Sequence, residues 1–157
     1  MQEGKKLTAQ EAHQFFAADT NNSTWDLIEK EDRTPEESVR MIHQSHASAY
    51  HWSVAGEPVN VVRAHYLVAK AYFALEMIES AVFWAGKAWD GTVELGLDSW
   101  DYAFGCEIMA RAHAATGNES GFRDLHTKAV DAIGGLGKQD AALCQGELDR
   151  GPWFGMK

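Results

Sequence analysis

Histidine is concentrated in one short stretch of the chain, HQSHASAYHW, which spans residues 43–52 and contains His43, His46 and His51. Imidazole nitrogens bind divalent metal ions, and His43 and His46 have the i, i+3 spacing that metal sites on bundle helices use. On a helix, however, His51 falls on a different face, so one helix cannot direct all three rings to one ion. A third ligand would have to come from another helix, with His65 and His113 as the candidates, and no HExxH motif is present.

Two interpretations of this stretch follow. The first is a metal-binding helical bundle centred on His43, His46 and His65. The second is that His43, His46 and Tyr50 form a hydrogen-bonded polar seam inside a helical interface, because buried imidazoles need partners. The lack of a complete ligand motif favours the second interpretation, in which no metal or other cofactor is bound.

Composition narrows the remaining function classes. A chain of 157 residues, 45% of them hydrophobic, has the size of one globular domain. Its formal net charge of -9 disfavours nucleic acid and anionic membranes as partners. The opening MQEGKKLTAQ lacks the apolar core of a secretory signal, and no apolar run could span a bilayer, so we expect a cytoplasmic protein.

No catalytic motif is visible. The two cysteines, Cys106 and Cys144, have no CxxC spacing and are expected to be buried thiols. No glycine-rich loop follows a strand, no serine lies in a nucleophile elbow, and the paired carboxylates lie on polar helix faces. The sequence therefore indicates a protein that is not an enzyme.

The elements that must position these residues are all predicted to be helices, because strand patterns are nearly absent. Thr34, Pro35 and Glu37 have the pattern of a capping box and begin a helix that runs to about Ala55, after which Gly56 is expected in the left-handed conformation. Thr8 and Glu11 have the pattern of another capping box, which begins an earlier helix. The TNNST segment, residues 20–24, is poor in helix-forming residues and predicts a break in that helix. Further helices are predicted over residues 58–75, 99–116, 118–134 and 138–150. Another is predicted to end at about residue 95.

Small and aromatic residues recur in the same order in the segments that begin at Ala64 and Phe104. The first segment has Val68, Ala69 and Tyr72, then Ala81, Ala85 and Ala88; the second has Met109, Ala110 and His113, then Gly117, Phe122 and Ala129. This order resembles the tetratricopeptide repeat, a helical hairpin in which small residues let two helices pack closely. The pattern departs from the consensus, because Tyr72 and His113 are 41 residues apart instead of about 34. Glu76 also replaces the turn glycine.

The resemblance implies an all-α fold in which antiparallel hairpins stack as a short right-handed superhelix. We expect a single helical domain over 1–157, with N-terminal helices at 8–55, two hairpins at 58–134, and a short helix with an aromatic tail at 138–157. The strings DRTPEE, HASAYHW and GPWFG are also similar to those of a family of small uncharacterised bacterial proteins. That likeness implies a tetratricopeptide-like fold and no established activity.

In such a superhelix the first helix of each hairpin lines the concave wall. The expected binding residues there are Arg63, Tyr66, Lys70, Phe73, Phe104, Glu107 and Arg111. Aromatic residues mixed with arginine are typical of protein interfaces. We therefore expect a non-enzymatic module that binds a protein or peptide partner, and three cations in an acidic protein suit a peptide carboxylate or an acidic helix.

Two alternatives remain for this surface. The N-terminal helices or the aromatic tail at 151–155 could cover the groove, leaving no open binding site. The chain could also be a structural homo-oligomer, and an exposed Trp25 or Trp153 would mark a dimer contact or a partner site.

Overall fold

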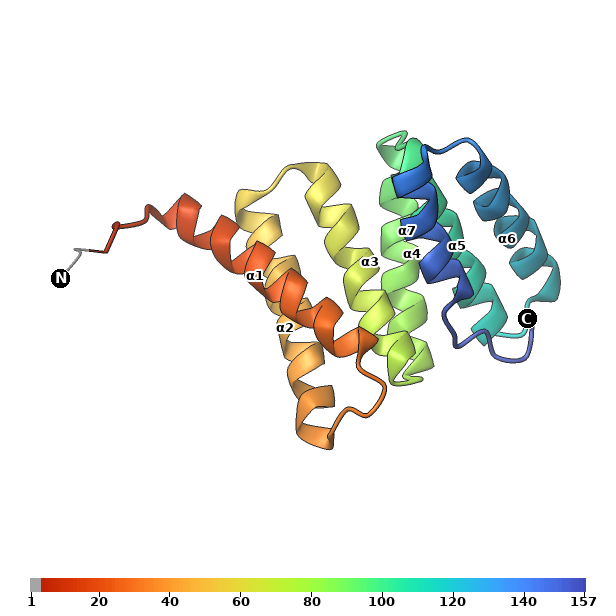
Figure 1. Ribbon diagram of the computed structural model, residues 1–157, viewed down its shortest axis with the longest axis horizontal. Helices are drawn as coiled ribbons and strands as arrows, with labels where there is room; N and C mark the ends of the chain where they lie inside the picture. Colours follow the sequence, from red (N-terminus) through yellow and green to blue (C-terminus); the bar gives the residue numbers. More distant parts are fainter. Residues whose placement is uncertain (1–3) are drawn as a thin grey trace.

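The computed structural model describes residues 4–157, so the first three residues of the predicted domain lie outside the described part. The described residues form seven α-helices and no strand, which confirms the all-α prediction. The helices are α1 (Ala9–Glu29), α2 (Pro35–Ala55), α3 (Pro58–Ala74), α4 (Ile78–Glu94), α5 (Ser99–Ala115), α6 (Glu119–Gly134) and α7 (Lys138–Asp149) (Figure 1).

The helices pack in the order in which they follow along the chain. Helices α1 and α2, α3 and α4, and α5 and α6 form three hairpins, and α7 packs on α5 and α6. Successive hairpins meet through α2 and α3 and through α4 and α5. In addition, α1 contacts α3, α3 contacts α5, and α5 contacts α7, so the odd-numbered helices share one face of the molecule (Figure 1).

Helices α1 and α7 lie at opposite sides of this face. In Figure 1, α1 lies in front of α2, and α7 lies in front of α4 and α5. Within the described chain these two helices have no close backbone contact, so they flank a space whose floor is α3 and α5. The residues that were predicted to line the concave groove lie on these two helices, α3 and α5.

The helix starts follow the capping signals in the sequence. Thr8 and Thr34 each accept a hydrogen bond at 3.1 Å from the backbone N–H three residues later, and Glu11 and Glu37 accept a hydrogen bond from the N–H of Thr8 and Thr34. Pro58 occupies the start of α3, where its missing N–H costs nothing. Both predicted capping boxes are therefore confirmed.

The predicted break in the first helix is wrong, because α1 continues through residues 20–24. The Ser23 and Thr24 hydroxyls donate hydrogen bonds to the carbonyl oxygens of Asp19 and Thr20, at 2.9 and 2.6 Å. Thr24 is fully buried. Its hydroxyl therefore finds a partner inside the helix, and packing overrides the low helix propensity of this segment.

The turns follow the sequence in part. Gly96 and Gly117 have left-handed backbones, with φ of 59° and 76°. The prediction for Gly56 is wrong, because its φ is -104° and its N–H bonds to the Trp52 carbonyl in an extended cap. Glu76 has a φ of 54°, so it takes the left-handed conformation that a turn glycine would adopt without steric cost.

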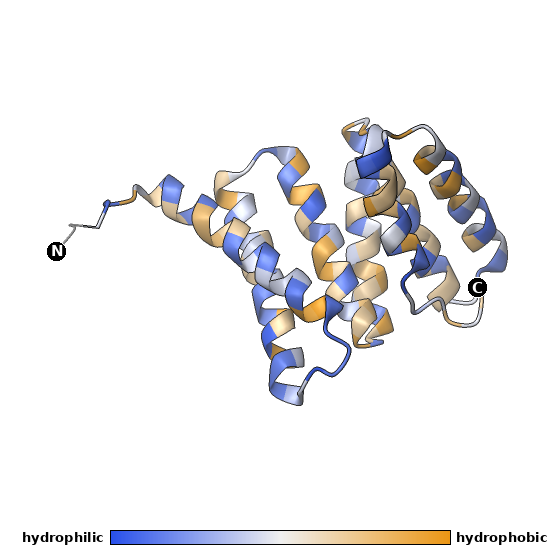
Figure 2. Ribbon diagram, viewed as in Figure 1, coloured by the Kyte–Doolittle hydropathy of each residue, from blue (hydrophilic) through white to orange (hydrophobic). Residues whose placement is uncertain are grey.

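The core depends on small residues that let neighbouring helices approach closely. Ala69, Ala81 and Ala85 are fully buried between α3, α4 and α5. Close approach is tightest at Gly91, where an added Cβ would lie 2.5 Å from Val62 Cγ2, and at Gly105, where it would lie 2.9 Å from Thr92. Apolar residues recur along every helix with polar residues between them (Figure 2). None of the described helices is both long and apolar enough to cross a membrane.

Candidate ligand-binding cavity

Most of the predicted groove residues are buried instead of facing an open surface. Lys70, Phe73, Glu107 and Arg111 are each at most 3% exposed, and Tyr66 is 8% exposed. Tyr66 and Phe73, which were expected on the concave wall, both belong to the apolar cluster between α3, α4 and α5.

Four of the buried residues belong to an ionic network that joins α3, α5 and α7. The Tyr66 hydroxyl donates a 2.8 Å hydrogen bond to Glu107 Oε2, and Lys70 Nζ lies 3.3 Å from Glu107 Oε1. Lys70 Nζ is also 2.8 Å from Glu147 Oε2 on α7. Arg111 pairs with Glu107 one helical turn away on α5. Each cation in this network thus contacts at least one carboxylate.

Burial and charge act in opposite directions on these groups. Burial lowers the pKa of the Lys70 ammonium, while the charges of Glu107 and Glu147 raise it. Burial also raises the pKa of Glu107, but the charges of Lys70 and Arg111 outweigh it and hold that pKa below its ordinary value. Burial and the neighbouring Glu107 charge raise the pKa of Tyr66 well above its ordinary value. The network is therefore a set of charges that compensate one another away from water.

The C-terminal tail covers this part of the predicted groove. Arg111 donates hydrogen bonds to the carbonyl oxygens of Glu147, Arg150 and Pro152, at 3.0, 3.0 and 2.8 Å. Its guanidinium lies 4.1 Å from the centre of the Trp153 ring, and Trp153 is buried. The alternative in which the tail closes the groove therefore applies to Arg111 and to Phe73, whose ring centre lies 6.1 Å from that of Phe154.

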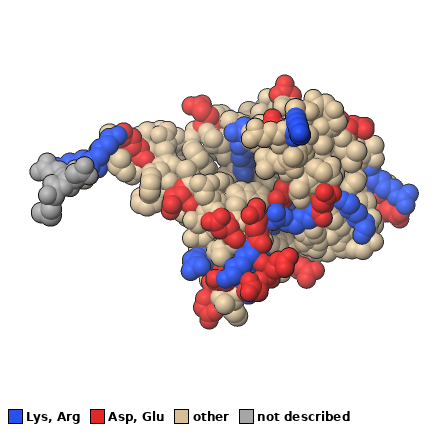
Figure 3. Space-filling model, viewed as in Figure 1, with Lys and Arg blue, Asp and Glu red and all other residues tan. Residues whose placement is uncertain are grey.

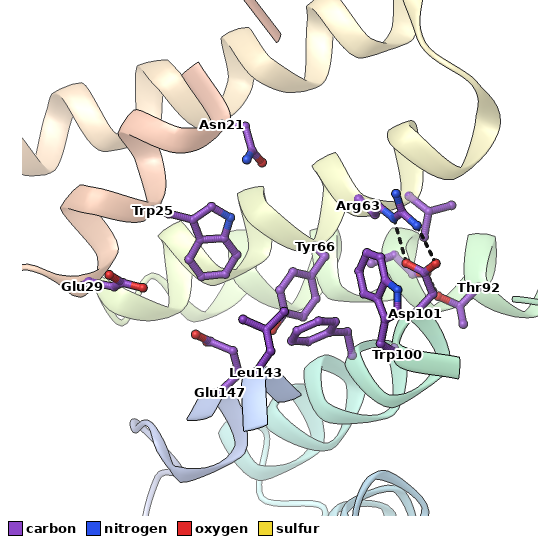
Figure 4. Close-up of a pocket in the computed structure, with 14 residues that line it drawn as sticks. Asn21, Trp25, Glu29, Arg63, Tyr66, Thr92, Trp100, Asp101, Leu143 and Glu147 are labelled. Atoms are coloured by element: carbon purple, nitrogen blue, oxygen red, sulfur yellow. Dashed lines mark hydrogen bonds and ion pairs between the residues drawn. The ribbon is translucent and has the colours of Figure 1, made fainter. Parts of the chain in front are cut away.

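An open cavity of about 330 Å³ lies beside the tail, between α1, α3, α4, α5 and α7. Its apolar wall contains Trp25 of α1, Tyr66 of α3, Trp100 and Phe104 of α5, and Leu143 of α7 (Figure 4). The volume lies within the range of about 300–1,000 Å³ that is typical of small-ligand sites.

Four aromatic rings form a continuous wall along this cavity. The Trp25 and Tyr66 ring centres are 6.2 Å apart, those of Tyr66 and Phe104 are 5.1 Å apart, and those of Phe104 and Trp100 are 5.8 Å apart. These separations are typical of aromatic contacts in cores and interfaces. We refer to this site, with its four rings and Leu143, as the aromatic cavity.

Polar groups stand at both ends of the aromatic cavity (Figure 4). Arg63 donates two hydrogen bonds of 2.9 Å to the two carboxylate oxygens of Asp101, and its guanidinium lies 4.2 Å from the Trp100 ring centre. Glu29 and Glu147 border the cavity on the side of Trp25. The predicted residues Arg63, Tyr66 and Phe104 therefore meet at one site.

The anionic partner inferred from Arg63, Lys70 and Arg111 is not supported by this geometry. All three cations already contact carboxylates of the chain itself, namely those of Asp101, Glu107 and Glu147. A second crevice of about 460 Å³ borders Lys70 and Arg111 from the side of Arg150, but it reaches the same paired charges.

Several residues of the aromatic cavity were not predicted as part of it. Leu143 is 59% exposed on α7, and Glu29 and Asn21 project from α1. Trp25 was expected to mark a dimer contact or a partner site if exposed; it is half-buried and lies on the cavity wall. No local pattern could have joined these residues, because they come from the two helices at opposite sides of the groove.

Two of the histidines considered as metal ligands, His46 and His65, make local packing contacts. His46 Nε2 lies 2.8 Å from the Tyr72 hydroxyl, and the His65 ring lies 5.2 Å from the Trp84 ring. Burial lowers the pKa of both imidazoles. The prediction that His43, His46 and Tyr50 form one buried polar seam is wrong. His43 and Tyr50 are exposed, and the hydrogen-bond partner of His46 is on α3.

The metal alternative lacks a ligand set in this structure. Within residues 4–157, no group of three or more histidine, cysteine, aspartate or glutamate side chains is arranged to hold an ion. The closest pair of imidazoles is His13 and His51, whose Nδ1 atoms are 2.8 Å apart. Cys106 and Cys144 are buried free thiols, as predicted. Burial raises the pKa of Cys106, and it raises that of Cys144 to about 11, which disfavours the reactive thiolate.

Comparisons with protein families, with curated proteins and with solved structures find no match for this chain.

Proposed function

We propose that the protein is a non-enzymatic interaction module that holds a segment of a protein or peptide partner in the space between α1 and α7. The aromatic cavity is the anchor pocket of this module. Its helices then act as a short tetratricopeptide-like array, whose odd-numbered helices present the binding wall.

One observation carries this proposal: an open, aromatic-walled cavity is lined by predicted groove residues of α3 and α5, although the tail covers Arg111 and Phe73. Binding energy at protein interfaces is concentrated in buried tryptophan, tyrosine and arginine contacts. Trp25, Tyr66 and Trp100 already stand on helices, so an entering apolar side chain would meet walls that need little ordering.

A peptide selection tests the proposal directly. A random peptide library is selected on the wild-type protein, and the enriched peptides are measured against Leu143→Arg, which places a long cation at the cavity mouth. Leu7→Arg is the matched control, because Leu7 is similarly exposed and lies before α1, away from the cavity.

We expect enriched peptides that bind wild type and Leu7→Arg alike and lose at least tenfold in affinity for Leu143→Arg, since a blocked anchor pocket removes about 1.4 kcal/mol or more. Equal affinity for all three proteins would reject the aromatic cavity as the binding site.

A further inference from the structure

The two ends of the aromatic cavity differ in how well their charges are compensated. At one end, the Arg63 guanidinium makes two hydrogen bonds with Asp101 and lies over the Trp100 ring. Both charges and one ring face are thus already engaged. A ligand has little to gain from further charge at this end.

At the other end, Glu29 is paired only with a loosely held cation, whereas the neighbouring Glu147 is already paired with Lys70 at 2.8 Å. Arg150 Nη2 lies 3.6 Å from Glu29 Oε1 and 3.5 Å from Glu147 Oε1. Charge-assisted hydrogen bonds are about 2.7–2.9 Å long, so neither contact is a formed hydrogen bond. The Glu29 side chain is 58% exposed and has no shorter ion pair in the described chain. This end can therefore accept another hydrogen-bond donor that carries positive charge.

Aromatic surface next to these carboxylates favours the same charge. A cation over a tryptophan face is stabilised by the ring quadrupole. Lys70 lies 5.9 Å from the Tyr66 ring centre, whereas no cation of residues 4–157 stands over Trp25. Trp25 thus lines the cavity at the same end as Glu29, with no cation of the described chain over its ring (Figure 4).

The protein as a whole is also negatively charged. Figure 3 shows aspartate and glutamate side chains gathered on this face, around the end of α1 and the start of α2, with lysine and arginine side chains among them. The chain has a formal net charge of -9. A negative field around a cleft raises the local concentration of cations and the rate at which they arrive.

From these contacts we infer that the occupant is a basic segment of a partner protein, in which an aromatic side chain enters the aromatic cavity and a neighbouring lysine or arginine reaches Glu29. This inference rests on the proposed function, because it names the chemistry of the partner that the cavity anchors. The inferred partner segment is positively charged, whereas the sequence pattern favoured a negatively charged partner.

Three indole compounds of different charge test separately whether an aromatic ring enters the cavity and whether a positive charge adds affinity. Indole, tryptamine and indole-3-acetate are titrated into the ¹⁵N-labelled protein, and the side-chain N–H signals of Trp25 and Trp100 report the cavity. These signals are assigned with Trp25→Phe and Trp100→Phe. We expect tryptamine to bind about tenfold more tightly than indole, since it adds a cation next to a carboxylate and a ring face, and indole-3-acetate to bind most weakly.

Substitutions assign the preference to one carboxylate. Glu29→Gln should reduce the advantage of tryptamine over indole to about twofold, while leaving indole binding unchanged. Glu31→Gln is the matched control, because this carboxylate is two residues away and outside the cavity lining. Circular dichroism confirms that both variants keep the helix content of wild type.

Each outcome decides one statement. Equal binding of indole and tryptamine would overturn the cationic partner and leave the cavity as an anchor site, whereas no shift with either compound would overturn the proposed function as well. The peptides acetyl-Lys-Trp-Lys-amide and acetyl-Glu-Trp-Glu-amide test the source of the cation. Preference for the basic peptide supports a protein segment, and binding of tryptamine without it would overturn that assignment.

Discussion

Replacing Arg111 with methionine should release the C-terminal tail and strongly destabilise the fold. Methionine keeps much of the side-chain length but removes the pairing with Glu107 and the hydrogen bonds to three carbonyl oxygens of the α7 end and the tail. Glu107 would then depend on Lys70 and Tyr66 alone, and the Trp153 ring would lose the guanidinium that covers it.

The size of the effect follows from burial. Removing one partner of a buried ion pair costs about 3–5 kcal/mol, because the other charge stays in a poorly solvated site. Arg111 has 0% of its surface exposed, so solvent screening does not reduce this figure. A domain of this length loses about 2–4 °C of melting temperature per kcal/mol, which predicts a decrease of about 10 °C.

Urea unfolding followed by circular dichroism measures this loss, and Arg123→Met is the control. Arg123 pairs with Glu119 at the same i, i+4 spacing on α6, but both side chains are exposed, and exposed pairs of this kind contribute about 0.3–0.5 kcal/mol. If Arg111→Met costs no more than Arg123→Met, then the buried network does not hold α7 and the tail in place. Tryptophan hydrogen exchange at Trp153 should increase only in Arg111→Met.

Two further predictions concern local features. Burial, and to a smaller extent the Lys87 charge, lower the pKa of His65 below its ordinary value of 6.5. The unfolded chain therefore protonates His65 more readily than the folded chain does, and the free energy of unfolding should fall as the pH decreases below about 6.5. His65→Gln should show a smaller decrease in urea midpoint between about pH 7.5 and about pH 5, and an equal decrease would contradict the assignment. At the α3–α4 turn, Glu76→Gly should be more stable than Glu76→Ala by about 1 kcal/mol in the same assay, because a φ of 54° penalises any side chain; equal stabilities would show that the turn relaxes.

Local signals predicted the helices well, because each one depends on residues close in sequence. The threonine, proline and glutamate pattern at Thr34 fixes a start through hydrogen bonds within one turn. The alanines of α4 mark the face that meets α3 and α5. The predicted helix break at the TNNST segment is wrong because Thr24 is buried by tertiary packing, which helix propensity does not describe.

The position of the site could be predicted only in part. Helix α3 contacts α1, α2, α4 and α5, so it is buried on more than one side, and the rule that one stripe faces the core does not apply to it. Tyr66 and Phe73 were therefore assigned to a surface that other helices cover. The pairing of Arg63 with Asp101 and of Lys70 with Glu147 joins residues far apart in the chain, and no periodicity indicates it.

The most direct test of the aromatic cavity as a binding site is the tryptophan side-chain N–H spectrum of the ¹⁵N-labelled protein with an enriched peptide from the selection. The structure predicts that the Trp25 and Trp100 signals move while that of Trp153, under Arg111, stays in place. Shifts confined to Trp153, or an unchanged spectrum at saturating peptide, would contradict binding in this cavity.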